Sequence, residues 1–228
     1  MAKPIYLIGG SKGGVGKTLV TMAVVDYLEA QQEAVLLIES DTSNPDVWKA
    51  YQEQVPTEVV NLDEADGWIQ LVNTCDRYPG STVVINTAAR NNRGVSAYGV
   101  TLNDTLPELQ RQLVTLWVIN RQRDSLELLW DYMDALPGAV VHVVRNHYFG
   151  DEKKFELYND SEVKKRVERQ GGRSLDFPDL ADRVADDLNG QRLTIRTALK
   201  ALPLGNRAEL TRWRAEVARM LAPVILDE

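Results

Sequence analysis

A glycine-rich stretch near the N-terminus contains the residue types that bind phosphate. It reads Gly10-Ser11-Lys12-Gly13-Gly14-Val15-Gly16-Lys17-Thr18. Glycines let several backbone N–H groups turn toward one anion, and the positive end of a following helix adds to the attraction. Lys17 would reach the β- and γ-phosphates of a nucleotide, and the Thr18 hydroxyl would bind Mg²⁺. The stretch therefore predicts a phosphate loop in which the backbone of Gly13, Gly14, Val15 and Gly16 contacts the ligand.

Apolar runs alternate with helical patterns along the chain around this loop. Short apolar runs predict five strands, at 5–8, 34–38, 83–85, 116–119 and 140–144. The spacing of apolar residues predicts helices over 17–31 and 124–136. Apolar strands separated by helices indicate a parallel sheet covered on both faces. We therefore expect an α/β, doubly wound, mostly parallel sheet over residues 1–228, with the glycine-rich loop between its first strand and first helix.

Composition and charge limit the classes of protein to consider. The chain has 228 residues, of which 44% are hydrophobic and 26% charged, as in an ordinary globular protein. Its single cysteine, Cys75, allows neither an internal disulfide nor a four-thiolate metal site. The cysteine count and the N-terminal sequence, whose apolar run meets Gly9-Gly10 too soon for a signal-peptide core, predict a cytoplasmic protein. No run of about 18 apolar residues is present, so we expect no membrane insertion. The net charge of −7 argues against nucleic acid as a partner, although an average can hide a local basic patch.

The form of the loop, from Lys12 to Thr18, resembles the deviant Walker A loop of the ParA/MinD family of dimerising P-loop ATPases. The resemblance implies ATP and Mg²⁺ as cofactors and an ATP-dependent homodimer. It also implies that Lys12 reaches across the dimer interface to the nucleotide of the partner. The small size of the chain is similar to that of the compact, plasmid-borne branch, which includes partition ATPases and conjugation accessory proteins.

Polar residues after the later strands extend this resemblance. Glu39 and Asp41 match the two acids of the family's Asp-x-Asp segment, which implies that Asp41 helps to place Mg²⁺ and the attacking water. Asn86 stands where the family has the Walker B aspartate. An amide can accept a hydrogen bond from a metal-bound water but brings no negative charge, so we expect slow hydrolysis. The sequence leaves open whether Asn86 is native or engineered. By the same resemblance, Asn146 reads the adenine edge and the loop at Pro178 packs along the base.

Two later segments differ in charge from the rest of the chain. Residues 150–174 are highly charged and predict a surface insertion of helix and loop. Residues 191–222 carry seven basic and two acidic residues, a net charge of +5, which leaves −12 for the remainder. The last predicted helix has an apolar stripe, with Arg207, Arg212, Arg214 and Arg219 outside it. These arginines either contact DNA phosphates without sequence specificity, as several ParA-like proteins do from a comparable region, or form a solvated face.

Three functions are compatible with these features. The first is an ATP-dependent dimerising switch with slow hydrolysis, acting in plasmid partition, positioning or conjugative transfer through an adaptor or DNA-binding partner protein. The second is a nucleotide-binding adaptor that recruits a partner protein with little or no hydrolysis, which Asn86 favours. The third is a P-loop biosynthetic enzyme, for which the sequence shows no small-molecule signature.

Overall fold

The computed structural model describes residues 3–10, 13–89 and 92–225. In these residues, seven parallel strands form one sheet in the order β3-β2-β4-β1-β5-β6-β7. The strands are β1 (Ile5–Gly10), β2 (Val35–Glu39), β3 (Thr57–Val59), β4 (Thr82–Asn86), β5 (Leu113–Ile119), β6 (Val140–Asn146) and β7 (Ser174–Phe177). The predicted doubly wound α/β sheet is confirmed, and its described strand pairs are all parallel rather than mostly so.

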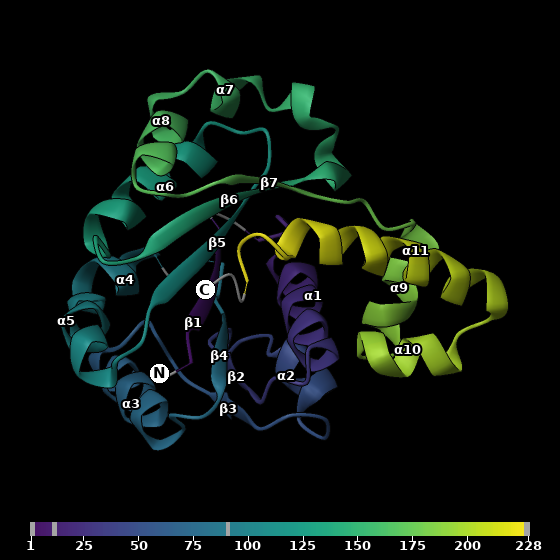
Figure 1. Ribbon diagram of the computed structural model, residues 1–228, viewed down its shortest axis with the longest axis horizontal. Helices are drawn as coiled ribbons and strands as arrows, with labels where there is room; N and C mark the ends of the chain where they lie inside the picture. Colours follow the sequence, from purple (N-terminus) through teal and green to yellow (C-terminus); the bar gives the residue numbers. More distant parts are fainter. Residues whose placement is uncertain (1–2, 11–12, 90–91, 226–228) are drawn as a thin grey trace.

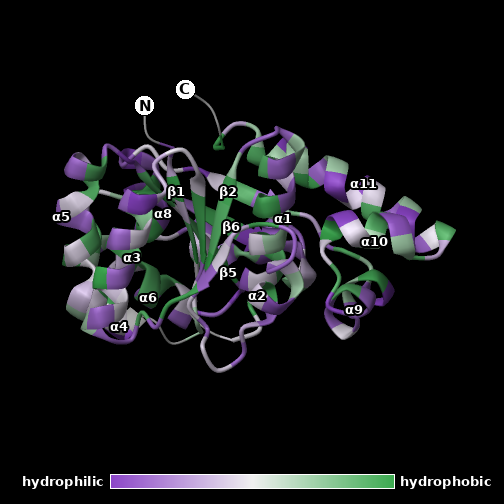
Figure 2. Cartoon of the chain, turned by 90° about the horizontal axis from the view of Figure 1, so that it is seen from below, coloured by the Kyte–Doolittle hydropathy of each residue, from purple (hydrophilic) through white to green (hydrophobic). Residues whose placement is uncertain are grey.

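Helices cover both faces of the sheet, as Figure 1 shows. On one face lie α1 (Lys17–Ala30), α2 (Asp46–Tyr51), α9 (Asp182–Gly190), α10 (Ile195–Ala201) and α11 (Leu204–Leu221). On the other lie α3 (Ala65–Arg77), α4 (Asn92–Tyr98), α5 (Val100–Leu109), α6 (Asp124–Ala135), α7 (Glu156–Asn159) and α8 (Glu162–Arg169). Two short 3₁₀ helices, η1 (His147–Phe149) and η2 (Glu152–Lys154), follow β6. Figure 2 shows hydrophobic strands between the two layers of helices. The apolar side chains are buried on both faces of the sheet.

The alternation of side chains along each strand divides the interior into two cores. On β1, Tyr6 and Ile8 join the core under α1 and α11. Ile5 and Leu7 join the core under α3 to α6. Successive strand residues point to opposite faces, so a strand buried on both faces reads as a continuous apolar run. This explains why the central strands were predictable from the sequence.

Both edge strands are absent from the sequence-based prediction. β3 and β7 have three and four residues; β3 contains a single apolar residue, Val59, and β7 alternates polar with apolar residues. Neither provides the apolar run by which the five other strands were found, because an edge strand has less surface to bury. The charged segment 150–174 contains η2, α7 and α8 and connects β6 to β7.

The order of the strands places a ligand site at the end of β1. The chain passes from β1 to β2, β3 and β4 on one side of the sheet, and then to β5, β6 and β7 on the other. In open parallel sheets, ligands bind outside the carboxyl ends of the strands where the order reverses. The loop between β1 and α1 lies at that point. Among the described residues, none of the helices is long and apolar enough to cross a membrane.

Candidate nucleotide-binding site

The loop between β1 and α1 has the backbone geometry that its glycines allow. Gly14 and Gly16 have φ angles of +78° and +104°, a region that other residues rarely adopt. Gly16 is also the N-cap of α1, and a Cβ atom there would collide with the side-chain amide of Asn146. Both positions therefore require glycine. Lys12, predicted to act across a dimer interface, lies outside the described residues.

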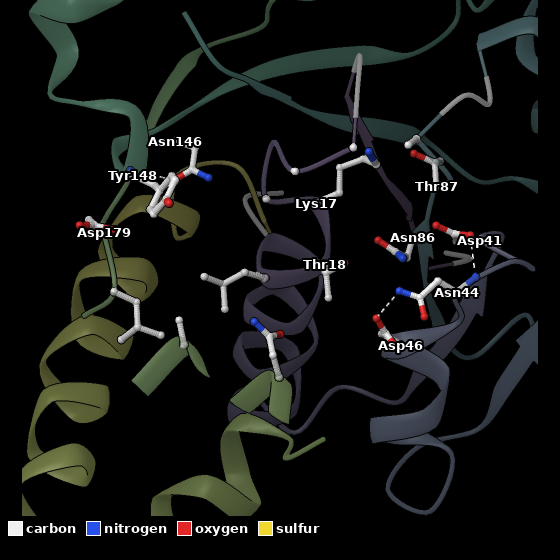
Figure 3. A pocket seen from close by; sticks show the side chains of 18 of the residues that line it. Lys17, Thr18, Asp41, Asn44, Asp46, Asn86, Thr87, Asn146, Tyr148 and Asp179 are labelled. Atoms are coloured by element: carbon white, nitrogen blue, oxygen red, sulfur yellow. Dashed lines mark hydrogen bonds between the residues drawn. The ribbon is translucent and has the colours of Figure 1, made fainter. Parts of the chain in front are cut away.

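A pocket of about 520 Å³ lies between this loop and the carboxyl ends of the strands. Its size is within the usual range for a small-molecule site. The predicted residues that line it are Gly13, Gly14, Gly16, Lys17, Thr18, Asp41, Asn86, Asn146 and Pro178. Val15 is buried below the loop and is not part of the lining. Figure 3 shows Lys17 and Thr18 between Asn86 and Asp41 on one side and Asn146 and Tyr148 on the other. The fold thus brings together residues that are up to 165 positions apart in the chain.

Lys17 provides a cation in a partly dehydrated position. It is 8% exposed, and burial lowers its pKa to about 8, while the nearby Asp41 charge opposes that shift. A buried ammonium group gains stability when an anion binds beside it. The chemistry of Lys17 therefore suits the phosphate group of a ligand.

The amide of Asn86 is held between two neighbours at the end of β4. Its Nδ2 donates a hydrogen bond to Oε1 of Glu39 at 2.8 Å, and its Oδ1 accepts one from Thr21 Oγ1 at 2.9 Å. Glu39 is fully buried and pairs with Asn86 in the register of β2 and β4. Burial raises the pKa of Glu39 to about 7, while hydrogen bonds from the Asp41 backbone and Asn86, with a smaller influence of the Trp48 backbone, lower it. Glu39 was noted in the sequence, but its contact with Asn86 was not predicted.

The oxygen atoms at this edge form a donor set that suits Mg²⁺. Thr18, Asp41 and Asn86 line the pocket with a hydroxyl, a carboxylate and an amide oxygen. Mg²⁺ prefers oxygen ligands and usually keeps several waters and substrate phosphates in its shell. The described residues contain no cluster of three or more His, Cys, Asp or Glu side chains that could hold a metal ion by themselves. The residues therefore fit a metal that binds together with a nucleotide.

Asn146 connects the phosphate loop to β6. Its Nδ2 donates to the Val15 carbonyl oxygen at 2.9 Å, and its Oδ1 accepts from the Tyr148 backbone N–H at 3.1 Å. The amide thus supports the loop while lining the pocket. Its predicted contact with the adenine edge stays a prediction.

Arg145 holds the end of β6 in place through contacts with β7 and with the charged segment 150–174. The buried guanidinium donates to both carboxylate oxygens of Asp176 on β7, at 2.9 and 2.8 Å. It also donates to Glu152 and Asn159 in the charged segment. Two parallel hydrogen bonds between a guanidinium and a carboxylate fix the orientation of the arginine side chain as well as its distance from the acid. Sequence reasoning missed this contact, although an arginine that follows an apolar strand run was a visible signal.

The pocket end opposite Asn86 contains residues that the sequence analysis did not select. Tyr148 is 64% exposed, and its ring packs edge-on against Phe149. Leu180 and Asp179 line the same end, and partial burial, with the Asp182 charge second, raises the pKa of Asp179. An aromatic ring beside apolar side chains provides a surface on which a nucleobase can stack. The loop at Pro178 was expected to pack along the base, whereas the only signal for Tyr148 was its position two residues after Asn146.

The four arginines predicted to contact DNA have different surroundings on α11. Arg212 donates to Glu209 and Glu216, and Arg214 donates to the buried Asp26 of α1 at 2.5 Å. The Nε atom of Arg207 is buried, with no hydrogen-bond partner in the described residues. Arg219 is exposed and makes no ion pair within the described part of the chain. The structure therefore does not present all four as one unpaired basic surface, and their role toward DNA stays a prediction.

Fold and site together define a P-loop nucleotide-binding domain, and comparison with known proteins agrees. Residues 6–169 match the CbiA family model, described as the CobQ/CobB/MinD/ParA nucleotide binding domain. The chain belongs to this family, which confirms the resemblance inferred from the loop. It is 72% identical over 225 residues to Protein MobD of Acidithiobacillus ferrooxidans, covering 99% of both chains.

Solved structures show the same fold at low sequence identity. MinD cell division protein of Aquifex aeolicus has a TM-score of 0.55 at 16% identity, covering 96% of this chain and 97% of that one. The MinC:MinD cell division protein complex of Aquifex aeolicus gives 0.54 at 15%, covering 99% and 98%. The signal recognition particle receptor FtsY of Elizabethkingia anophelis gives 0.53 at 15%, covering 78% of this chain and 59% of that one.

Proposed function

We propose that this protein is an ATP-dependent dimerising switch that acts in the positioning or transfer of plasmid DNA. The observation that carries the proposal is the pocket itself, in which Lys17, Thr18, Asp41 and Asn86 surround a phosphate loop at the reversal point of a parallel sheet. Membership of a nucleotide-binding family supports the ligand class. The name of the relative MobD favours mobilisation among the possible roles with DNA.

A dimer is the expected active form because the pocket is open on the side of the loop. Gly13 and Gly14 are exposed, so a second copy can approach the phosphates without displacing core side chains. Lys12 precedes these glycines and would reach the nucleotide of the partner subunit, as the family resemblance implies. The MinC:MinD complex shows that a protein of this fold binds a partner protein, which supports a recruiting role for the dimer.

The residues divide the work of a slow phosphoryl transfer to water. Lys17 neutralises the β- and γ-phosphates, and Asp41 orients the water whose oxygen attacks the γ-phosphorus as the bond to the β-phosphate oxygen breaks and ADP leaves. Thr18, Asp41 and Asn86 would hold Mg²⁺, which neutralises charge on the phosphates when bound. Asn86 brings no charge of its own, so we expect slow turnover.

A second candidate function is an adaptor that binds ATP with little or no hydrolysis. The amide at Asn86 favours it, because both ends of this side chain already hydrogen-bond to protein groups. Phosphate release from the wild-type protein decides between the two. Multiple turnovers per subunit support the switch, and less than one turnover over hours supports the adaptor.

Dimerisation is tested by size-exclusion chromatography with light scattering, with ATP, with ADP and without nucleotide. We expect a mass near the 25.6 kDa of one chain without nucleotide and near twice that value with ATP. Lys12→Ala should bind ATP and stay monomeric, whereas Lys17→Ala should lose nucleotide binding. Monomers at every ATP concentration, for wild type and Lys12→Ala alike, would contradict the proposal.

A further inference from the structure

A carboxyl group and an amide contact each other at the ends of two neighbouring strands. Glu39 ends β2 and Asn86 ends β4, and the two residues face each other in the sheet register. Both side chains are buried, and Asn86 Nδ2 donates to Glu39 Oε1 at 2.8 Å. The other carboxylate oxygen, Oε2 of Glu39, is buried without a hydrogen bond in the described residues. A buried carboxyl group that is only half satisfied is costly and needs an explanation.

The contact decides which way the Asn86 amide points. An amide side chain has one oxygen that accepts and one nitrogen that donates, and the two can exchange places by rotation. Glu39 Oε1 accepts, so the nitrogen of Asn86 faces β2. The oxygen therefore faces α1, where it accepts from Thr21 and keeps a second lone pair. Of the two polar side-chain atoms of Asn86, this oxygen is the one that can interact with a cation or accept from its bound water.

Glu39 also contacts the second residue of the proposed metal edge. The same Oε1 atom accepts a hydrogen bond from the backbone N–H of Asp41 at 2.9 Å. Asp41 and Asn86 line the pocket (Figure 3), whereas Glu39 contacts both of them and is not part of the lining. One carboxyl oxygen thus holds both an acid and an amide whose oxygens suit a hard cation. Residues placed behind metal ligands in this way orient them and tune metal affinity.

We propose that Glu39 and Asn86 form one acid–amide unit in which Glu39 is a positioning residue: it supplies the carboxyl group that position 86 lacks and directs the Asn86 oxygen toward the metal side. The proposal rests on the proposed function for the metal and nucleotide. One consequence can be tested in the protein without nucleotide or metal. An aspartate at position 86 is acceptable only if position 39 no longer carries a carboxyl group.

The physical reason is the short distance between the two side chains. Asn86→Asp would place two carboxyl groups in hydrogen-bond contact inside the protein, where both cannot be ionised. In the exchange variant Glu39→Gln/Asn86→Asp, the amide nitrogen of the new glutamine would donate to the new aspartate, so the pair again contains a single carboxyl group, now on β4 instead of β2. The Asp41 backbone N–H, which shares Oε1 of Glu39 with Asn86 in the wild type, would lose that acceptor, so we expect a partial recovery.

Thermal unfolding without nucleotide tests this coupling. We expect Asn86→Asp to lower Tm by about 5–10 °C, which is the scale for a buried group left without its partner in a chain of this length. Glu39→Gln should lower Tm by less, because glutamine still accepts both hydrogen bonds. The exchange variant should recover at least half of the loss caused by Asn86→Asp. If Asn86→Asp does not fold, a folded exchange variant is the supporting result. Equal or additive losses would overturn the proposal.

The Mg²⁺ dependence of nucleotide binding tests the positioning role. A fluorescent ATP analogue is titrated into each variant with Mg²⁺ and with EDTA, and the ratio of the two affinities is compared. Glu39→Gln keeps both hydrogen bonds but removes the carboxyl charge behind the metal edge, and it should reduce this ratio about ten-fold, the lower end of the usual effect of changing a group behind a metal ligand. The exchange variant should restore it. An effect on Tm without a change in the ratio would show that Glu39 is only structural and would overturn the positioning role.

Glu58→Gln is the matched control. Glu58 lies on the adjacent strand β3 and accepts a hydrogen bond from Thr74, but it does not line the pocket. This variant should leave the Mg²⁺ ratio unchanged. If the wild-type protein binds no nucleotide, the proposed function fails, while the stability coupling between positions 39 and 86 is still decided by unfolding.

Discussion

His142 is a buried imidazole on β6 whose charge state makes stability depend on pH. It is 5% exposed, and its Nδ1 accepts a hydrogen bond from the Arg173 backbone at 3.0 Å. Burial, with the Arg173 charge second, lowers the pKa of His142 to about 4 from its ordinary value of 6.5. Because the folded-state pKa lies below the unfolded one, the neutral ring stabilises the fold above pH 6.5. This contribution is lost as the pH falls from 6.5 toward 4.

We expect His142→Gln to lose less stability than the wild type on acidification. The measurement is the free energy of unfolding by urea at pH 7 and at pH 5. From pH 7 to pH 5 this free energy should fall by about 2 kcal/mol less in His142→Gln than in the wild type, as the linkage relation gives. Carboxylates that titrate in the same range affect both proteins equally and cancel in the comparison. Parallel pH profiles for wild type and variant would contradict this assignment.

At the scale of whole elements, Arg111 joins the segments before β1 and β4 to the end of α3. These contacts lie at the amino ends of the strands, opposite the nucleotide pocket. The guanidinium of Arg111 donates to the carbonyl oxygens of Lys3 before β1, Cys75 and Tyr78 at the end of α3, and Ser81 before β4. These carbonyls include acceptors that a helix leaves unpaired at its end. A planar group with five donors can reach four such acceptors at once, which lysine cannot.

Arg111→Ala should therefore lower the free energy of unfolding by about 3 kcal/mol, since buried acceptors would lose their partner. Arg111→Lys should recover only part of this loss. Both variants should bind nucleotide with wild-type affinity where they are folded, because the pocket is at the opposite edge. Denaturant unfolding and nucleotide titration measure the two effects, and a change below about 0.5 kcal/mol for Arg111→Ala would count against the role.

At the scale of the molecule, ion pairs neutralise several of the basic residues that give segment 191–222 its positive net charge. The segment 191–222 has a net charge of +5, but Arg214 pairs with Asp26 and Arg196 with Glu29, both on α1. Arg212 lies between Glu209 and Glu216 of its own helix. Arg212 and Arg219 are the exposed members of the four arginines, and Arg219 has no such pair among the described residues. Arg219 is therefore the position at which a DNA contact of α11 can be tested without breaking an internal ion pair.

If α11 contacts DNA, Arg219→Glu should weaken ATP-dependent binding of a fluorescent duplex. The slope of log affinity against log salt should fall by about one for each phosphate that the variant no longer neutralises. Arg169→Glu is the matched control, because Arg169 is exposed on α8, on the other face of the sheet, and the change in net charge is the same. Equal weakening in both variants would assign the effect to overall charge, and no binding at low salt would remove DNA as a partner.

The sequence by itself determined the parts of the protein that depend on neighbours along the chain. The phosphate loop could be predicted because strand, glycines, Lys17 and helix follow one another directly. The central strands could be predicted because burial on both faces makes their sequence apolar throughout. The edge strands β3 and β7 could not, because they are short and at least half of their residues are polar.

Only the tertiary structure decided which distant side chains meet. Glu39 and Asn86 are 47 residues apart, Arg145 and Asp176 are 31 apart, and Asp26 and Arg214 are 188 apart. Each pair depends on the order of the strands or on the packing of α11 against α1, and neither is visible in local spacing. For this reason the sequence located the nucleotide pocket, whereas the buried neighbour of the Asn86 amide and the acid that pairs with Arg214 were settled by the fold.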